Sequence, residues 1–222
     1  LFACVAPPGG VERQKRNGKL AVLLGPAASG KTTIMHKLHH RCMHDALCDP
    51  CKPVPVLIHV FRLARMLIQE GTADNDTACD TPMLERFVSS EHGFNLKDGE
   101  DGAQGVLERL VQGRAGIAGG SATAIFFFDG LDEGGQFKSD IEECVAELAR
   151  QSHARVIVSS RETGFDHTAF ADGLIDRMFE VLPLTDAMKL STIEARLLSP
   201  DVDGGRWTDR DCKKLHHQIK SN

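Results

Sequence analysis

The chain has 222 residues, of which 41% are apolar and 26% are charged, a balance typical of a globular domain. Its 26 Lys and Arg against 31 Asp and Glu give a formal charge of −5. This charge argues against a general polyanion-binding surface, so we expect no nucleic-acid partner. No apolar run approaches the eighteen or so residues that a membrane span needs, so we expect no membrane partner. Disordered, collagen-like, coiled-coil and membrane proteins are excluded on these grounds.

Seven cysteines stand at irregular spacings, several of them in stretches with a helical pattern. This favours reduced thiols over a disulfide framework. The apolar residues 1–6 lack the charged region and the length of a signal peptide, so we expect a cytoplasmic location. The chain opens on Leu1 and stops inside a helical pattern, and we therefore expect it to be a piece of a longer polypeptide.

Short apolar runs alternate with helical patterns along the chain, which indicates a mostly parallel sheet covered by helices on both faces. We predict strands at residues 20–24, 54–60, 124–128, 155–160 and 178–182. Helices are predicted at residues 32–45, 62–69, 82–90 and 106–111, from residue 139 onward, and after residue 185, and a further one begins at residue 207. The residues between 71 and 104 outside the predicted helix are expected to form surface loop. The fold class is therefore α/β, with five strands in one doubly wound domain.

Three of these helices carry more detailed predictions. In the first, Ile34, Leu38 and Cys42 recur at a spacing of four and are expected to face the core. The sequence S-D-I-E at residues 139–142 matches a capping box, so Ser139 is predicted to cap the helix after the third strand. Thr185 is predicted to cap the helix that follows the fifth strand.

Residues 25–32 read G-P-A-A-S-G-K-T, the G-x-x-x-x-G-K-T pattern of a phosphate-binding loop. Glycine lets the backbone wrap a phosphate with its N–H groups pointing inward, and the following helix presents its positive dipole end to the same anion. Lys31 is expected to reach the β- and γ-phosphates, and the Thr32 hydroxyl to ligate magnesium. A chance match is the alternative, but a buried strand before the pattern and a helix after it favour a real site. The predicted nucleotide-binding residues are Gly25, Pro26, Ala27, Ala28, Ser29, Gly30, Lys31, Thr32 and Thr33.

The third strand runs into the acidic sequence D-G-L-D-E at residues 129–133. Asp129, at the carboxyl end of a buried strand, is expected to hold Mg²⁺ directly or through water. Asp132 and Glu133 are placed to orient or deprotonate an attacking water. The alternative is that these carboxylates merely begin a loop or helix.

The fourth strand ends in S-S-R at residues 159–161. The carboxyl edge of a parallel sheet is where ligands bind, and a guanidinium makes paired contacts with phosphate oxygens. Arg161 is therefore predicted to sense the γ-phosphate. A surface salt bridge is the alternative.

The phosphate loop, the D-G-L-D-E sequence and the S-S-R strand end, in this order, resemble the NACHT domain, the switch-type P-loop ATPase module of NOD-like receptors. The stretches V-L-I-H-V-F-R-L-A-R at 56–65 and F-E-V-L-P-L at 179–184 are similar to the family's second strand and fifth strand. The resemblance spans about residues 20–198 and implies the strand order 5-1-4-3-2. It also implies adenine nucleotide as ligand and self-association through this domain in the full-length protein. By resemblance, residues 1–18 are a linker, 19–200 the nucleotide-binding domain and 201–222 the start of a truncated helical lid domain.

The resulting function hypothesis is an ATP/ADP-binding signalling switch with slow, Mg²⁺-dependent ATP hydrolysis, in which Asp132, Glu133 and Arg161 are the catalytic residues. A scaffold that binds nucleotide without hydrolysing it is the first alternative. A small P-loop phosphotransferase is the second, and the acidic sequence fits it poorly.

A second group of chemically capable residues lies between positions 36 and 51. Cys48 and Cys51 form a C-x-x-C pair that, with an upstream histidine, could ligate zinc. His36, His40 and His44 recur at a spacing of four, however, and a solvated helix face is the reading that we favour.

Overall fold

The computed structural model describes residues 4–5, 19–49, 51–70, 79, 81–92, 124–150, 154–170, 173–183 and 185–197, with residues 210, 213–214 and 217. The chain divides into two compact units, and the unit Cys4–Val181 contains the sheet. The second unit, residues 1–3 and 182–222, contains helix α6 (Asp186–Leu197). The predictions of a helix at 106–111 and of surface loop between 71 and 104 fall largely outside the described residues, as does most of the predicted terminal helix.

Five parallel strands form the sheet: β2 (Leu20–Leu24), β3 (Val54–His59), β4 (Ala124–Asp129), β5 (Ala154–Ser160) and β6 (Ile175–Val181). They lie in the order β6-β2-β5-β4-β3, which confirms the α/β class and the order 5-1-4-3-2. A two-residue strand, β1 (Cys4–Val5), pairs antiparallel with β6 at the edge. The sequence analysis did not predict β1, which falls in the segment expected to be a linker.

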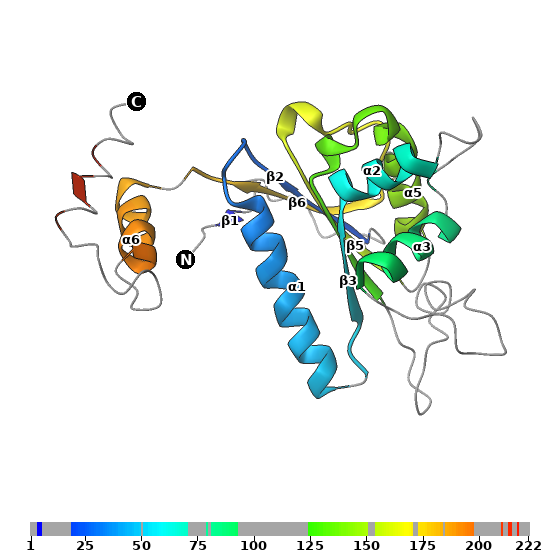
Figure 1. Ribbon diagram of the computed structural model, residues 1–222, viewed down its shortest axis with the longest axis horizontal. Helices are drawn as coiled ribbons and strands as arrows, with labels where there is room; N and C mark the ends of the chain where they lie inside the picture. Colours follow the sequence, from blue (N-terminus) through cyan, green and yellow to red (C-terminus); the bar gives the residue numbers. More distant parts are fainter. Residues whose placement is uncertain are drawn as a thin grey trace. The chain divides into compact units, whose positions relative to one another are not determined.

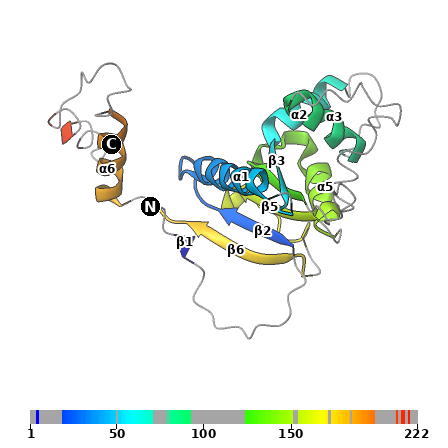
Figure 2. The same ribbon diagram turned by 90° about the horizontal axis from the view of Figure 1, so that it is seen from below.

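Strand β4 shows why this sheet needs helices on both faces. Its three consecutive phenylalanines, Phe126, Phe127 and Phe128, are all fully buried. Successive side chains of a strand point to opposite faces, so a continuous apolar run requires cover on each side. Helix α1 (Lys31–Cys48) lies over one face, while α2 (Val60–Glu70), α3 (Thr81–His92) and α5 (Lys138–Arg150) cover the other (Figures 1 and 2).

The buried face of α1 differs from the predicted one. Ile34, Met35 and His39 are buried, whereas Leu38 is 41% exposed. His39 packs edge-on against Phe127, with ring centroids 5.7 Å apart. The face that meets the sheet is therefore centred on Met35 and His39, one turn apart, to one side of the stripe that the spacing of four predicted.

The start of α5 also differs from its prediction. Two short 3-10 turns, η2 (Leu131–Glu133) and η3 (Gly135–Phe137), lead directly into the helix, which begins at Lys138. Ser139 is consequently inside the helix and is not its cap. The predicted buried face of this helix is confirmed at Ile141, Val145, Leu148 and Ala149.

The predicted cap of α6 is confirmed. The backbone N–H of Met188 donates a hydrogen bond to Thr185 Oγ1 over 3.3 Å, so the threonine satisfies one of the free donors of the first turn. Among the described residues, the cysteines at positions 42, 48, 51, 79 and 144 are not joined in disulfides.

The packing of β4 against α1 gives a stability test. Replacing Phe127 by alanine should lower the free energy of unfolding by about 3–5 kcal/mol, because the substitution leaves a cavity under His39. The control is Leu47→Ala on α1, where the side chain is 82% exposed. This substitution should change the free energy of unfolding by no more than about 0.5 kcal/mol. Denaturant unfolding of the two variants checks this, and equal losses would contradict the assigned helix face.

Candidate functional site

The phosphate loop joins β2 to α1 at the carboxyl edge of the sheet, and its glycines are required by space and by conformation. A Cβ on Gly25 would come within 2.9 Å of Ser29 Oγ and 3.1 Å of the Val181 side chain on β6. Gly30 precedes α1 with φ 92°, a value that favours glycine. Ala28 also takes a positive φ, 58°, so the loop holds one non-glycine residue in a conformation that costs about 1–2 kcal/mol.

Lys31 is folded back over this loop. Its Nζ donates hydrogen bonds of 2.8 Å to the carbonyl oxygens of Gly25 and Pro26. Burial lowers the pKa of Lys31, and the nearby Arg161 acts in the same direction, while Asp132 opposes the shift. The ammonium group is thus held beside the loop by neutral carbonyls, which an anionic ligand can replace.

Asp129 ends β4 with a buried carboxylate held from the β5 side. Ser159 Oγ on β5 donates a hydrogen bond of 2.6 Å to Asp129 Oδ1, and it accepts one of 2.9 Å from the backbone N–H of Gly130. His59 Nδ1, at the end of β3, lies 3.7 Å from Asp129 Oδ2. Burial lowers the pKa of His59, and Asp129 partly opposes this. The magnesium ligand predicted from the sequence is therefore fixed in orientation by two neighbouring strands.

Asp132 is bound to the end of β5. Its Oδ2 lies 3.0 Å from Arg161 Nε, and its Oδ1 accepts a hydrogen bond of 3.0 Å from the Arg161 backbone N–H. Ser160 Oγ adds a longer contact of 3.4 Å to the same oxygen. Arg161 thus does form a salt bridge, as the alternative interpretation proposed, but its partner, Asp132, is itself one of the predicted catalytic residues.

Glu133 lies beside Asp132 at the same edge of the sheet and lines the cavity there. Burial raises the pKa of Glu133, and the negative charges of Asp132 and Asp129 raise it further. Gly130 turns the chain toward it with φ 81°, and a Cβ at this position would come within 3.0 Å of the Glu133 carboxyl group. Glycine at position 130 is therefore required both by φ and by the closeness of Glu133.

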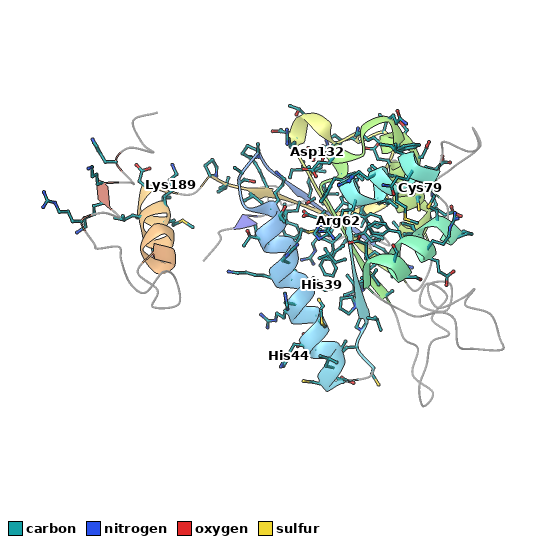
Figure 3. All side chains as sticks on the ribbon, in the orientation of Figure 1. His39, His44, Arg62, Cys79, Asp132 and Lys189 are labelled. Atoms are coloured by element: carbon teal, nitrogen blue, oxygen red, sulfur yellow. The ribbon has the colours of Figure 1, made fainter. Side chains whose placement is uncertain are left out.

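These groups surround one cavity of about 340 Å³. Its lining contains most of the predicted site residues together with two others, namely Ala27, Ala28, Ser29, Gly30, Lys31, Thr32, Thr33, Asp129, Gly130, Asp132, Glu133, Ser159 and Arg161. Gly25 and Pro26 lie outside the lining and serve as acceptors for Lys31. Figure 3 shows Asp132 at this end of the sheet, while His44 lies far down α1.

The residues present fit a nucleotide phosphate with Mg²⁺. Ser29 Oγ is buried and has no hydrogen-bond partner among the described atoms, and a bound anion would give this hydroxyl an acceptor. The hydroxyl of Thr32 and the carboxylate of Asp129 line the same cavity and are the hard oxygen donors that Mg²⁺ prefers.

Sequence reasoning noted the hydroxyls of residues 159–160 but did not include Ser159 in the site, and it missed His59. His59 is the last residue of β3 and Ser159 is the last but one of β5, and these two strands flank β4 in the sheet. The polar side chains at the carboxyl ends of the two strands would have indicated both.

The Cys/His stretch at 36–51 does not form a cluster of three or more metal-ligating residues in the described part of the chain. His44 and Cys48 approach to 3.9 Å at an exposed position, and Cys51 is exposed. His40 and His44 are exposed to solvent, as predicted. His36 is only partly exposed, and its ring lies 5.3 Å from the ring of His59.

No protein-family model matches the chain, and no curated protein sequence matches it. Among solved structures, a match to the Aeropyrum pernix ORC1 protein in complex with DNA has a TM-score of 0.49 and 12% identity, and covers 80% of this chain. A match to C. elegans PCH-2 has a TM-score of 0.46 and 16% identity, and covers 86% of this chain. The chain spans 43% of the length of each of these proteins.

One expectation from the sequence is corrected here. The exclusion of a nucleic-acid partner rested on the net charge of −5, but a chain that this one matches is described in complex with DNA. Net charge averages over the whole chain, whereas nucleic-acid binding depends on local charge, so the exclusion does not stand. Within the described residues, no helix combines the length and the apolar character needed to cross a membrane.

The contact between η4 (Glu162–Gly164) and Asp132 gives a test of the site's geometry. A Cβ on Gly164 would overlap with Asp132 Cβ, so Gly164→Ala should lower the free energy of unfolding by about 1–3 kcal/mol. In an Asp132→Gly background the overlapping atom is absent, and the same substitution should then cost little. A double-mutant cycle measures the coupling, and simple additivity would contradict the contact.

Proposed function

We propose that the chain binds ATP and ADP at this cavity and hydrolyses ATP slowly with Mg²⁺, as a nucleotide-dependent signalling switch of the NACHT type. The observation that carries the proposal is the convergence of Lys31, Thr32, Asp129, Glu133 and Arg161 on one cavity at the carboxyl edge of a 5-1-4-3-2 sheet. The division into a domain at 19–200 and a lid beginning at 201 is part of this proposal, as is the cytoplasmic location.

Nucleotide binding would use the loop amides and Lys31. The backbone N–H groups at the start of α1 and the helix dipole favour a phosphate at this position. Because Lys31 Nζ already lies over the loop, it needs only to exchange the carbonyls of Gly25 and Pro26 for phosphate oxygens. Thr32 and Asp129 would hold Mg²⁺, which neutralises charge on the β- and γ-phosphates.

The two further carboxylates have different surroundings, and this separates their roles. Asp132 is engaged by Arg161 through its side chain and its backbone, so we assign it the positioning of Arg161. Glu133 has no comparable cationic partner among the contacts of the described residues, and its raised pKa makes it the better proton acceptor. We therefore assign to Glu133 the orientation and deprotonation of the attacking water.

The switch would depend on Arg161, which is about half exposed and can change partner. In the structure its Nε lies 3.0 Å from Asp132 Oδ2. A γ-phosphate in the cavity would compete with that carboxylate, whereas ADP lacks the group. A ligand shifts a conformational equilibrium only by such differential contacts.

Nucleotide binding is tested by titrating ADP and ATP, with Mg²⁺, into wild type and Lys31→Ala in a calorimeter. The substitution removes a charge-assisted hydrogen-bond donor and should weaken binding by at least about 10- to 100-fold. Lys52→Ala, an exposed lysine beyond the far end of α1, is the control and should bind as wild type does. Equal binding by wild type and Lys31→Ala would place the nucleotide elsewhere.

Hydrolysis is tested by Glu133→Gln, which keeps the shape of the side chain and removes the base. Phosphate release should fall by about 10²- to 10⁴-fold, while ADP affinity stays unchanged. Glu162→Gln, an exposed neighbour of Arg161 outside the cavity lining, is the control and should hydrolyse at the wild-type rate.

Turnover unchanged by Asp132→Asn and Glu133→Gln together would refute the catalytic assignment. A wild type that binds ATP and releases no phosphate would be a scaffold, and phosphate transfer to a small acceptor above the rate to water would indicate a phosphotransferase.

A further inference from the structure

Three side chains from three different elements meet on the β3 side of Asp129. They are His36 from α1, His59 from the end of β3 and Asp129 from the end of β4. One ligand atom from each lies within 4.8 Å of the others. Among the described residues this is the group whose spacing suits a metal ion, and the sequence analysis assigned neither histidine to a site.

The fold fixes this arrangement. His59 and Asp129 are register partners on adjacent parallel strands, and each is the last residue of its strand. Their side chains therefore start from neighbouring backbone positions at the edge of the sheet. His36 follows Thr32 by one turn of α1, so it lies on the helix face that carries the predicted Mg²⁺ ligand. Its ring is tilted by 51° against that of His59.

One atom of this group needs a partner. His36 Nε2 is buried and has no hydrogen-bond partner among the described atoms. A buried polar atom without a partner is costly, and such atoms in folded proteins call for an explanation. Coordination of a metal ion by this nitrogen would supply the missing partner without a further hydrogen-bonding group from the protein.

The donor set selects a class of metal. Two imidazole nitrogens and one carboxylate oxygen suit borderline cations such as Zn²⁺, Co²⁺ or Fe²⁺, whereas Mg²⁺ prefers oxygen donors alone. With metal–ligand bonds of about 2.1 Å, two ligands of one ion lie about 3.0–3.4 Å apart. His59 Nδ1 and Asp129 Oδ2 lie 3.7 Å apart, which is close to this spacing.

We propose that His36, His59 and Asp129 form a site for one borderline divalent cation, distinct from the predicted Mg²⁺ position. The nucleotide cavity is lined by Asp129 but by neither histidine. The two carboxylate oxygens of Asp129 have different neighbours. Oδ1 accepts a hydrogen bond from Ser159 on the β5 side, whereas Oδ2 lies beside His59 on the β3 side. Three protein ligands leave a coordination position open for water or for another ligand.

The experiment uses the 222-residue chain, stripped of metal and free of nucleotide, and titrates it with Co²⁺. We expect one equivalent of Co²⁺ to bind and to give a visible d–d absorption without a thiolate charge-transfer band. Excess Zn²⁺ should displace it, because Zn²⁺ takes the same nitrogen and oxygen ligands. His36→Ala, His36→Gln and His59→Ala should each weaken binding by more than about 100-fold, because loss of a ligand costs more than loss of its supporting hydrogen bond. Circular dichroism and thermal unfolding of each variant report whether it is folded.

Two controls isolate the site. His44→Ala with Cys48→Ser and Cys51→Ser removes the exposed ligands at the far end of α1 and should leave Co²⁺ binding unchanged. Lys31→Ala disables the proposed nucleotide site and should also leave Co²⁺ binding unchanged. Failure of the proposed function would appear as loss of nucleotide binding, and failure of the metal site as loss of Co²⁺ binding, so the two are distinguishable. The proposal is overturned if wild type takes up no Co²⁺. It is equally overturned if the folded His36 variants bind as wild type does, or if binding is lost with the Cys48 and Cys51 substitutions.

Discussion

The burial of one carboxylate, that of Asp129, is the constraint on which the rest of this edge of the sheet depends. A buried charge is tolerated only with hydrogen-bond donors or cations around it, and β4 delivers Asp129 to the end of a fully apolar strand. Ser159 supplies a donor from β5, and its own oxygen is occupied by the Gly130 N–H. This chain of hydrogen bonds ties the end of β4, the turn that follows it and the end of β5 into one unit.

The turn after Asp129 then decides where the remaining charges lie. Because Gly130 adopts a positive φ, the chain folds at once into η2, and this brings Asp132 against the end of β5 and leaves Glu133 beside the cavity. Two carboxylates adjacent in sequence thereby acquire different environments. One is neutralised by a guanidinium, and the other keeps a raised pKa. The different surroundings of these two carboxylates follow from the backbone conformation at Gly130.

The sequence predicted those features that a single stretch determines by itself. Short apolar runs that end at Gly25, Asp129 and Ser159 were sufficient to place the central strands. Seven of the nine residues predicted from the phosphate-loop pattern, Ala27 to Thr33, line the cavity. The buried face of α1 could not be predicted, because it depends on the packing of His39 against Phe127, a residue far away in the sequence. The capping box at Ser139 failed for a local reason, since the turns before it already supply a helical start.

The pairing of His36 with His59 was missed for a related reason. A spacing of four on one helix is the same whether the histidines face solvent or a neighbouring strand, and only the strand order places β3 beside β4. The separation of Asp132 from Glu133 likewise required the position of Arg161 in space. In each case the missing information was a contact between distant segments.

The close packing of Gly25 against Val181 has a consequence for how a ligand's presence could be communicated. Val181 is the last residue of β6 and the last of the unit that contains the sheet, and the chain continues from it to the segment that carries α6. The space beside Gly25 is too small for a Cβ, because Ser29 Oγ and Val181 fill it. A movement of Gly25 toward that side would therefore meet the Ser29 side chain or the end of β6. The end of β6 is thus in direct contact with the phosphate loop at Gly25. A displacement of the loop at this glycine would be transmitted to the strand from which the chain continues toward α6.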